Sequence, residues 1–412
     1  MDKDSAIPQT LLPSAIERLL QELQSEPRAT IFEREKTAFD SKSAPFSNSI
    51  ILFGAGALGR YTLDGLRKIG IRPLAFSDNN SAFWSKSIDG IEVLPPDDAA
   101  AHCRHSACFV VTIYRGSKAR EHLHKLDCER VVDFPSLFWK YEKQFIPSSG
   151  LELPHRILDQ AEDIKIGYSL LHDEDSKREF CAQLRWRVLM DYCQLPDPGD
   201  DSHIYFPSDL ILPIDDEVLV DCGAFDGDSI RSFLRARRDV FKQIYAVEPD
   251  PTNRLALERF RDSLPPLLRA RVEIFPYALG SCNKTVSFDS GHSAGSRIVP
   301  ESGGDAVECR KLDDMPINHH PTYIKMDTEG AEPDAILGAA GILAKCSPVL
   351  AACVYHRCEH LWQIPQLVRT ISPTHRLLIR RYAEDCWEMV CYAVPPNRLS
   401  IDQSGLSKMR DL

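Results

Sequence analysis

The sequence predicts an α/β fold with two mostly parallel sheets, because one strand–turn–helix pattern occurs twice in it. The first copy is an apolar run at 49–53, a glycine-rich turn at 54–59 and a helical pattern at 60–69. The second copy is an apolar run at 218–220 and a glycine-rich turn that leads into a helix at 228–236. Later apolar runs alternate with helical patterns, which is typical of parallel strands joined by crossover helices.

The N-terminal turn is a G-x-G-x-x-G motif formed by Gly54, Gly56 and Gly59, and Asp78 follows 19 residues after the last glycine. In the Rossmann fingerprint such glycines hold a pyrophosphate and the acid holds a ribose. The sequence therefore predicts a small Rossmann-like βαβ domain and a candidate second nucleotide site at these four residues. A glycine turn kept for tight packing between strand and helix explains the same motif, and both interpretations stay open.

The C-terminal turn has the pattern D-x-G-x-x-x-G, with Asp221, Gly223 and Gly227 at its fixed positions. Glu248 ends the next apolar strand, 21 residues after Gly227. Small residues at such a turn let the backbone approach a ligand closely. An acid at the end of the second strand can accept hydrogen bonds from both ribose hydroxyls, so we expect a nucleoside-containing cofactor here.

The C-terminal half predicts a mixed sheet, because its last two strands follow each other with only a loop between them. Strands are expected at 218–220, 244–247, 272–275, 323–326, 349–355, 376–381 and 389–394, and helices at 228–236, 253–263, 333–341 and 362–370. The final two strands should form an antiparallel hairpin. Residues 290–304, with His292 and Arg297, are expected to form a surface loop or a loop that binds the acceptor.

The 412 residues allow two or three domains. We predict a helical lead-in at 1–46, the Rossmann-like domain at 47–143, a helical linker or cap at 144–215, the cofactor-binding domain at 216–396 and a C-terminal tail at 397–412. The lead-in is expected to pack on its own chain or on another subunit, and the sequence does not decide between these.

Composition limits the classes of partner. The net charge of −11 argues against general nucleic-acid binding, and no apolar run approaches the length of a membrane span. The N-terminal residues lack the apolar segment of a secretory signal, and the thirteen cysteines include no C-x-x-C pair. Reduced thiols fit this pattern, so we expect a cytoplasmic protein.

Four groups are expected at the carboxyl ends of successive strands, where the ligands of such sheets bind. They are the turn at Asp221, Glu248, the segment around Ala278, and Asp327 with Glu329. An acid beside the turn would repel the pyrophosphate of a dinucleotide, whereas S-adenosylmethionine (SAM) carries a cationic amino group and a sulfonium. The acids therefore favour SAM as the cofactor.

The same residues resemble the motifs of class I methyltransferases of the FkbM family. The resemblance lies in residues 221–228, 246–251, 323–332, 337–339, 355–356 and 362–365, and it covers about 206–394. Cys222 and Phe225 vary the first turn, and Thr328 replaces the usual aliphatic residue. The resemblance implies a class I Rossmann-like mixed sheet and SAM-dependent methylation of a hydroxyl on a sugar or a polyketide-like product.

The expected cofactor contacts come from the turn and the strand ends: Asp221, Gly223, Ala224, Phe225, Gly227, Glu248, Pro249, Ala278 and Asp327. His356 is the first candidate for the base that accepts the hydroxyl proton, and Asp327 and Glu329 are the second. Asp327 could instead only hold the methionine amino group, Glu329 could cap a helix, and His356 could be structural. Asp327 and Glu329 could also hold a divalent ion, but we predict no metal.

The sequence therefore predicts a SAM-dependent O-methyltransferase that modifies a hydroxyl of a sugar, glycan or secondary metabolite. The added N-terminal domain would recognise a nucleotide-linked acceptor or mediate assembly, including assembly as a homo-oligomer. Two alternatives stay open. One is an NAD(P)-linked oxidoreductase that uses the turn at Gly54, and the other is a non-catalytic protein whose sheets bind a nucleotide sugar or a partner.

Overall fold

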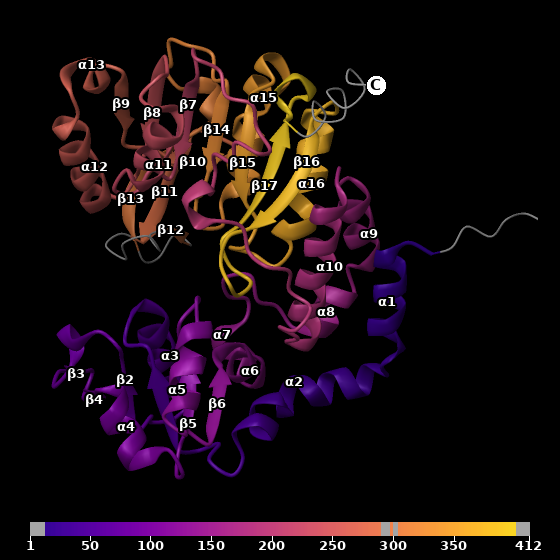
Figure 1. The fold of residues 1–412 in the computed structure, drawn as a ribbon, viewed down its shortest axis with the longest axis vertical. Coiled ribbons are helices and arrows are strands. Elements are labelled where there is room, and N and C mark those ends of the chain that lie inside the picture. The colour runs from indigo at the N-terminus through magenta and orange to yellow at the C-terminus, as the bar shows by residue number, and fades with distance from the viewer. Residues whose placement is uncertain (1–12, 290–296, 300–303, 401–412) are drawn as a thin grey trace, which may run out of the picture.

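The computed structural model describes residues 13–289, 297–299 and 304–400. Two α/β units, each a β-sheet with its helices, lie one above the other along the long axis of the molecule. The N-terminal sheet is below and the C-terminal sheet above (Figure 1). A group of helices from two separate parts of the chain runs along one side and connects them.

The N-terminal sheet has six strands in the order β3-β4-β2-β1-β5-β6, and its pairs are parallel except for β3 with β4. Its strands are β1 Ile50–Phe53, β2 Ala75–Ser77, β3 Ser87–Ile88, β4 Ile91–Leu94, β5 Cys108–Val111 and β6 Arg130–Asp133. Its helices are α3 Ala57–Lys68, α4 Pro96–Cys103, α5 Ser117–Lys125, α6 Phe134–Lys140 and α7 Glu142–Phe145, with the 3-10 turn η1 Ser81–Phe83. The residues of β1 and β5 are all buried, as expected for strands covered on both faces.

The C-terminal sheet has seven strands in the order β16-β17-β15-β14-β7-β8-β9. They are β7 Val218–Cys222, β8 Gln243–Val247, β9 Val272–Phe275, β14 Tyr323–Met326, β15 Val349–Cys353, β16 Arg376–Arg381 and β17 Met389–Val394. Strand β17 is antiparallel to both of its neighbours, and the other pairs are parallel. The predicted mixed sheet with a terminal antiparallel hairpin is confirmed.

The helices of this half are α11 Asp228–Arg237, α12 Pro251–Ser263, α13 Pro266–Arg269, α14 Glu332–Gly338, α15 Ala340–Cys346 and α16 His360–Ile371, with η2 Asp201–His203, η4 Leu312–Asp314 and η5 Pro396–Arg398. The single helix expected at 333–341 is two helices. The carboxylate of Asp313 accepts hydrogen bonds from the backbone N–H groups of Gly341 and Ile342, both at 2.8 Å, and so caps the start of the second helix.

A small four-stranded sheet, which the sequence did not predict, lies between β9 and β14 in the chain. Its order is β10-β13-β11-β12, with β10 Ala278–Leu279, β11 Lys284–Asp289, β12 Arg297–Val299 and β13 Asp305–Arg310. Half of the residues of β13 are exposed and only one is buried, so the strand shows little of the apolar alternation that marks a half-buried strand. The loop expected at 290–304 contains β12, and His292 lies outside the described residues.

The connecting helices are α1 Ala15–Ser25 and α2 Arg28–Ser43 from the lead-in, and α8 Pro154–Leu158, α9 Ala161–Ser169 and α10 Glu174–Leu189 from the predicted cap. Helix α1 begins at a capping box, in which Ser14 and Glu17 exchange hydrogen bonds with each other's backbone. Its apolar face joins the same core as α9, α10 and the C-terminal sheet.

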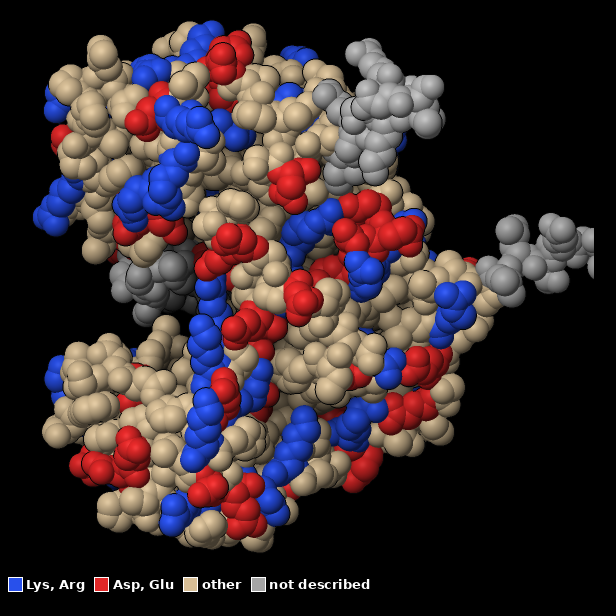
Figure 2. All heavy atoms as spheres, in the orientation of Figure 1, with Lys and Arg blue, Asp and Glu red and all other residues tan. Residues whose placement is uncertain are grey.

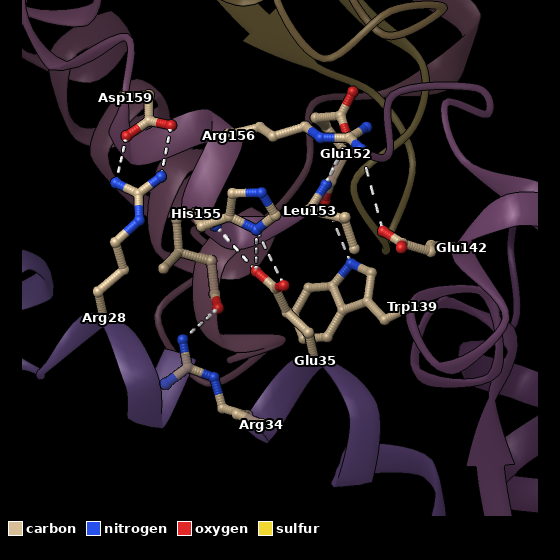
Figure 3. Close-up of polar contacts among 11 residues, drawn as sticks. Arg28, Arg34, Glu35, Trp139, Glu142, Glu152, Leu153, His155, Arg156 and Asp159 are labelled. Atoms are coloured by element: carbon tan, nitrogen blue, oxygen red, sulfur yellow. Dashed lines mark hydrogen bonds and ion pairs between the residues drawn. The ribbon is translucent and has the colours of Figure 1, made fainter. Parts of the chain in front are cut away.

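Polar contacts also join α2 to α8 (Figure 3). The buried carboxylate of Glu35 accepts a hydrogen bond from the backbone N–H of His155 and lies 2.9 Å from its Nδ1. Arg28 and Asp159 form a two-bond ion pair at 2.6 and 2.9 Å. The lead-in therefore packs on its own chain.

Two findings concern the environment of the chain. All thirteen cysteines lie within the described residues, and each is a free thiol. Along the described ranges, no helix combines the length and the apolar character needed to cross a membrane.

Candidate functional site

The main candidate site is a pocket at the carboxyl ends of β7, β8 and β14, where ligands of doubly wound sheets bind. Phe288 of β11 and Ile298 of β12 form part of its wall, so the small sheet closes one side. The pocket is open on one side, and its wall combines apolar and charged side chains, as is typical of ligand sites. The surface is hollowed between the upper and lower parts of the molecule, on the left of the view (Figure 2).

The turn after β7 passes very close to the end of β14. Gly223 has φ of +77°, and a Cβ placed there would lie 1.9 Å from the carbonyl oxygen of Asp327. Gly227 has φ of +89° and precedes α11. Glycine is therefore needed at Gly223 for contact between two backbones, in addition to any approach to a ligand.

Glu248 faces the pocket and also holds this turn. Its two carboxylate oxygens accept hydrogen bonds from the backbone N–H groups of Phe225, at 2.8 Å, and Asp250, at 2.9 Å. Burial raises the pKa of Glu248 to about 7, although both hydrogen bonds act to lower it. A carboxylate with this pKa changes its charge near neutral pH.

Asp221 does not line the pocket. It is fully buried, its Oδ1 lies 3.0 Å from Lys325 Nζ, and its Oδ2 accepts a hydrogen bond from the hydroxyl of Ser229. Lys325 also donates to the carbonyl oxygen of Gly223 at 2.5 Å. Burial lowers the pKa of Lys325, but Asp221 and Asp327 outweigh this effect and hold that pKa above its usual range. Asp221 therefore acts on the turn through a buried, charged lysine.

The pairing with Lys325 changes the charge argument made from the sequence. Because Lys325 balances Asp221, that acid does not by itself make the turn unfavourable for a phosphate. The acids that do line the pocket are Asp228, Glu248, Asp327 and Glu329. Among the described residues of the pocket wall Lys325 is the one cationic side chain, so the preference for a cationic ligand is retained.

The three predicted catalytic residues come together at the ends of β14 and β15. His356 Nε2 lies 3.3 Å from Asp327 Oδ1 and 3.6 Å from Glu329 Oε1. Glu329 and Gly330 have φ of +53° and +101°, which turns the backbone sharply after β14. Asp327 and Glu329 line the pocket, whereas His356 is buried and is not part of the wall.

Glu332, for which the sequence suggested no role, holds His356 from the other side. Its Oε1 lies 2.9 Å from His356 Nδ1 and accepts the N–H of Thr328 at 2.8 Å, and its Oε2 lies 3.3 Å from His360 Nδ1. Burial raises the pKa of Glu332, but His356 and His360 outweigh it and hold that pKa well below its usual range. The one signal for Glu332 in the sequence was its place three residues after Glu329. Acids are common in the first turn of a helix, so Glu332 looked ordinary there.

Glu329 and Glu332 face the two ring nitrogens of His356 and favour a positive charge on the imidazole. Burial lowers the pKa of His356, but these two carboxylates outweigh that effect and raise the pKa well above its ordinary value.

Tyr205 is a second functional residue that the sequence did not indicate. Its hydroxyl donates to Asp327 Oδ2 at 2.7 Å, and its ring lines the pocket. Its carbonyl oxygen accepts a hydrogen bond from the hydroxyl of Tyr323, which fixes the loop to β14. The only signal was a pair of aromatic residues, Tyr205 and Phe206, within a proline-rich connection.

The predicted cofactor residues are placed in two groups. Six line the pocket: Gly223, Phe225, Glu248, Pro249, Ala278 and Asp327. Asp221, Ala224 and Gly227 lie behind it, where they form the turn and the start of α11.

The N-terminal turn repeats the arrangement seen at Glu248. The two carboxylate oxygens of Asp78 accept hydrogen bonds from the backbone N–H groups of Ala55 and Asn80, both at 2.7 Å. A Cβ on Gly59 would lie 1.9 Å from the carbonyl oxygen of Gly54, so Gly59 is needed for close packing. Gly56 has no neighbour within 4 Å of such a Cβ, so it stands open as a backbone surface for a ligand.

A second cavity lies between α2 and the segment from α6 to α8, next to Glu35, Trp139 and His155 (Figure 3). Glu35 and His155 are paired with each other there, and the Trp139 indole N–H donates to the carbonyl oxygen of Glu152. None of the predicted site residues lines this cavity.

Residues 221–373 match the family model described as the methyltransferase FkbM domain. The matched segment begins within β7, at Asp221, and ends just beyond α16. The chain is also similar to the crystal structure of methyltransferase FkbM from Methylobacillus flagellatus KT, with 20% identity and a TM-score of 0.67. That likeness covers 92% of this chain and 98% of the other, so the two share their fold over nearly their full lengths.

Other solved structures are less similar. UDP-D-quinovosamine 4-dehydrogenase from Vibrio fischeri has 22% identity and a TM-score of 0.18, over 21% of this chain and 75% of that chain. Precorrin-6y C5,15-methyltransferase from Geobacter metallireducens GS-15 has 14% identity and a TM-score of 0.28, over 45% and 83%. These scores are too low to carry an argument. No curated protein matches the chain.

Proposed function

We propose that this protein, whose residues 221–373 form a methyltransferase FkbM domain, is a SAM-dependent O-methyltransferase that modifies a hydroxyl of a sugar, glycan or secondary metabolite. The observation that carries the proposal is the position of the pocket. It lies at the strand ends of this domain, is lined by four acids, and adjoins the group formed by Asp327, Glu329 and His356.

The residues of the pocket fit SAM by their chemistry. Glu248 has the position and charge to accept hydrogen bonds from ribose hydroxyls, and Asp228 and Asp327 are acids that can hold a cationic amino group. Phe225 and Tyr277 supply apolar surface for an adenine ring. When bound, SAM supplies a methyl group on a sulfonium, which an oxygen nucleophile can attack.

We assign the proton of the acceptor hydroxyl to the carboxylates at the end of β14. Glu329 and Asp327 line the pocket, whereas His356 is buried and is not part of its wall. Glu329 is the first choice of base, because a 30% exposed side chain can meet an acceptor, and Asp327 is already bonded to Tyr205. A positioned base typically contributes about 10²–10⁴-fold to the rate.

Calorimetric titration of the full chain with SAM and, separately, with NAD tests the cofactor. We expect SAM to bind, and Glu248→Gln to weaken it about 10- to 100-fold, the effect of losing charge-assisted hydrogen bonds of about 1.5–3 kcal/mol. Asp262→Asn, an exposed acid on α12, serves as the control and should leave the affinity unchanged. A folded protein that binds NAD and not SAM would favour the oxidoreductase alternative instead.

The acceptor is tested by mass spectrometry. Protein and SAM are incubated with panels of free sugars, glycans and nucleotide sugars, and the gain of one methyl group is measured. Methylation of nucleotide sugars alone would favour a role for the N-terminal domain in holding the nucleotide, with Gly54, Gly56, Gly59 and Asp78 as its site.

We retain the division of the chain into five segments as a proposal, although the lead-in and the cap share their core with the C-terminal sheet.

A further inference from the structure

The group of Asp327, Glu329 and His356 contains two buried polar atoms that have no hydrogen-bond partner. These atoms are His356 Nε2 and Asp327 Oδ1, and they face each other at 3.3 Å. His356 is only 7% exposed, so water cannot readily satisfy its nitrogen. An unprotonated nitrogen and a carboxylate oxygen repel each other at this distance, so a cation lies between them: either a proton on Nε2 or a metal ion.

The separations within the group match those of ligands around one small cation. Ligand atoms at about 2.0–2.2 Å from a tetrahedral Zn²⁺ lie about 3.4 Å from one another. His356 Nε2 is 3.3 Å from Asp327 Oδ1 and 3.6 Å from Glu329 Oε1, and all three ligand atoms lie within 4.8 Å of one another. A shared ion therefore needs only a small adjustment of these side chains.

The far side of each inner ligand is fixed by a further residue. Glu332 lies 2.9 Å from His356 Nδ1, which directs the Nδ1–H toward Glu332 and leaves Nε2 facing the two acids. The Tyr205 hydroxyl holds the second oxygen of Asp327. Such outer partners are typical of metal ligands. The sequence allowed a divalent ion at Asp327 and Glu329 but predicted no metal.

We propose that Asp327, Glu329 and His356 bind one divalent first-row metal ion, such as Mn²⁺ or Zn²⁺. One imidazole nitrogen and two carboxylate oxygens suit these ions. Asp327 and Glu329 have side chains that are 23% and 30% exposed toward the pocket, so the ion keeps coordination positions open on that side. In the proposed methyl transfer, on which this last step rests, the acceptor oxygen would occupy an open position and pass its proton to the second carboxylate oxygen of Glu329. The acceptor oxygen would then form a bond to the methyl carbon as the carbon–sulfur bond of the sulfonium breaks, leaving a neutral thioether.

Mn²⁺ binding is measured by electron paramagnetic resonance, in which free Mn²⁺ gives the signal and bound Mn²⁺ does not. The full chain is first stripped with a chelator and then titrated with MnCl₂. We expect one bound ion per chain, and an affinity at least about tenfold lower in Glu329→Gln and His356→Ala. Asp334→Asn, an exposed acid on α14, should bind Mn²⁺ like the original protein.

Two results would overturn the metal site. One is a folded protein that leaves the Mn²⁺ signal unchanged, in which case a proton on His356 is the cation. The other is Glu329→Gln binding Mn²⁺ as tightly as the original protein. A loss of binding in this variant can be assigned to the site, because the side chain of Glu329 is partly exposed and its change should not disturb folding. Calorimetry with SAM on the same stripped protein separates the two proposals. SAM binding without Mn²⁺ binding overturns only the metal, whereas loss of both overturns the proposed function as well.

Discussion

Glu248 is the residue at which the fold and the expected cofactor chemistry meet. The same carboxylate holds the turn after β7 through Phe225 and faces the pocket. Its burial raises its pKa to about 7, because a charged carboxylate loses hydration that two backbone hydrogen bonds restore only in part. Small changes of pH near neutrality therefore change the charge of the pocket.

SAM affinity is expected to rise with pH for this reason. The ionised form of Glu248 accepts ribose hydrogen bonds and attracts a cation, whereas the protonated form does neither as well. A free-state pKa of about 7 gives a dissociation constant about tenfold larger at pH 6 than at pH 8. Calorimetry at both pH values measures the two dissociation constants, and Glu248→Gln should remove their dependence on pH. An unchanged slope in Glu248→Gln would mean that another group titrates.

Asp221 shows why residue roles are hard to assign from a motif. It follows an apolar run and precedes a glycine turn, so it was expected to touch the cofactor. In the sheet it stands directly opposite Lys325 on the neighbouring strand, and the two charges pair in the interior. This register joins residues about a hundred positions apart, so no local pattern indicates it.

At the scale of elements, the contact between the β7 turn and the end of β14 determines the shape of the site. Gly223 and Asp327 meet backbone to backbone, and the turn is fixed further by the N–H of Gly223, which donates to the Val247 carbonyl at 3.0 Å. The acids that follow β14 are therefore positioned by a glycine in the turn after β7.

Gly223→Ala is expected to damage both stability and cofactor binding. A Cβ would lie 1.9 Å from a backbone oxygen, and φ of +77° itself costs about 1–2 kcal/mol for a residue other than glycine. We expect the free energy of unfolding to fall by at least about 2 kcal/mol, measured by urea denaturation, and SAM binding to be lost.

Gly56→Ala is the matched control, since it lies in the N-terminal turn with a negative φ and open space around its Cβ position. Its effect on stability should stay within about 0.5 kcal/mol. If Gly223→Ala were as stable as Gly56→Ala, close contact with β14 would not be the reason for a glycine there.

At the scale of the whole molecule, the C-terminal sheet shares its core with helices that precede it by many residues. Ile16, Leu20 and Leu23 of α1 are at most 3% exposed and belong to the same cluster as α9, α10 and the sheet. The N-terminal sheet is joined through Arg120, which pairs with Asp385 of the β16–β17 hairpin at 2.6 Å. The hairpin is thus a sheet edge and a joint between the two parts.

Leu20→Ala is expected to lower the free energy of unfolding by about 2–5 kcal/mol, because it leaves a cavity in that shared core. The exposed Gln24→Ala on the same helix should change it by less than about 0.5 kcal/mol. Urea denaturation of both variants, with loss of SAM binding as the measure of unfolding, compares their midpoints. Equal midpoints for the two variants would mean that the lead-in is not part of the cooperative unit.

The sequence by itself determined the two strand–turn–helix units, the terminal hairpin, and the row of acids at the ends of the strands. These features depend on residues close in the chain, where apolar periodicity and glycine turns are direct signals. Because successive parallel strands end at the same edge of a sheet, these patterns also predicted that Glu248, Asp327, Glu329 and His356 lie close together.

The tertiary structure alone decided which of those acids face the pocket. It buried Asp221 against Lys325, placed Tyr205 beside Asp327 and Glu332 behind His356, and added the small sheet that forms one wall. Each of these contacts depends on strand register or on packing between distant segments. Charges that look alike along the chain therefore differ in burial and in partners, and this difference sets their chemistry.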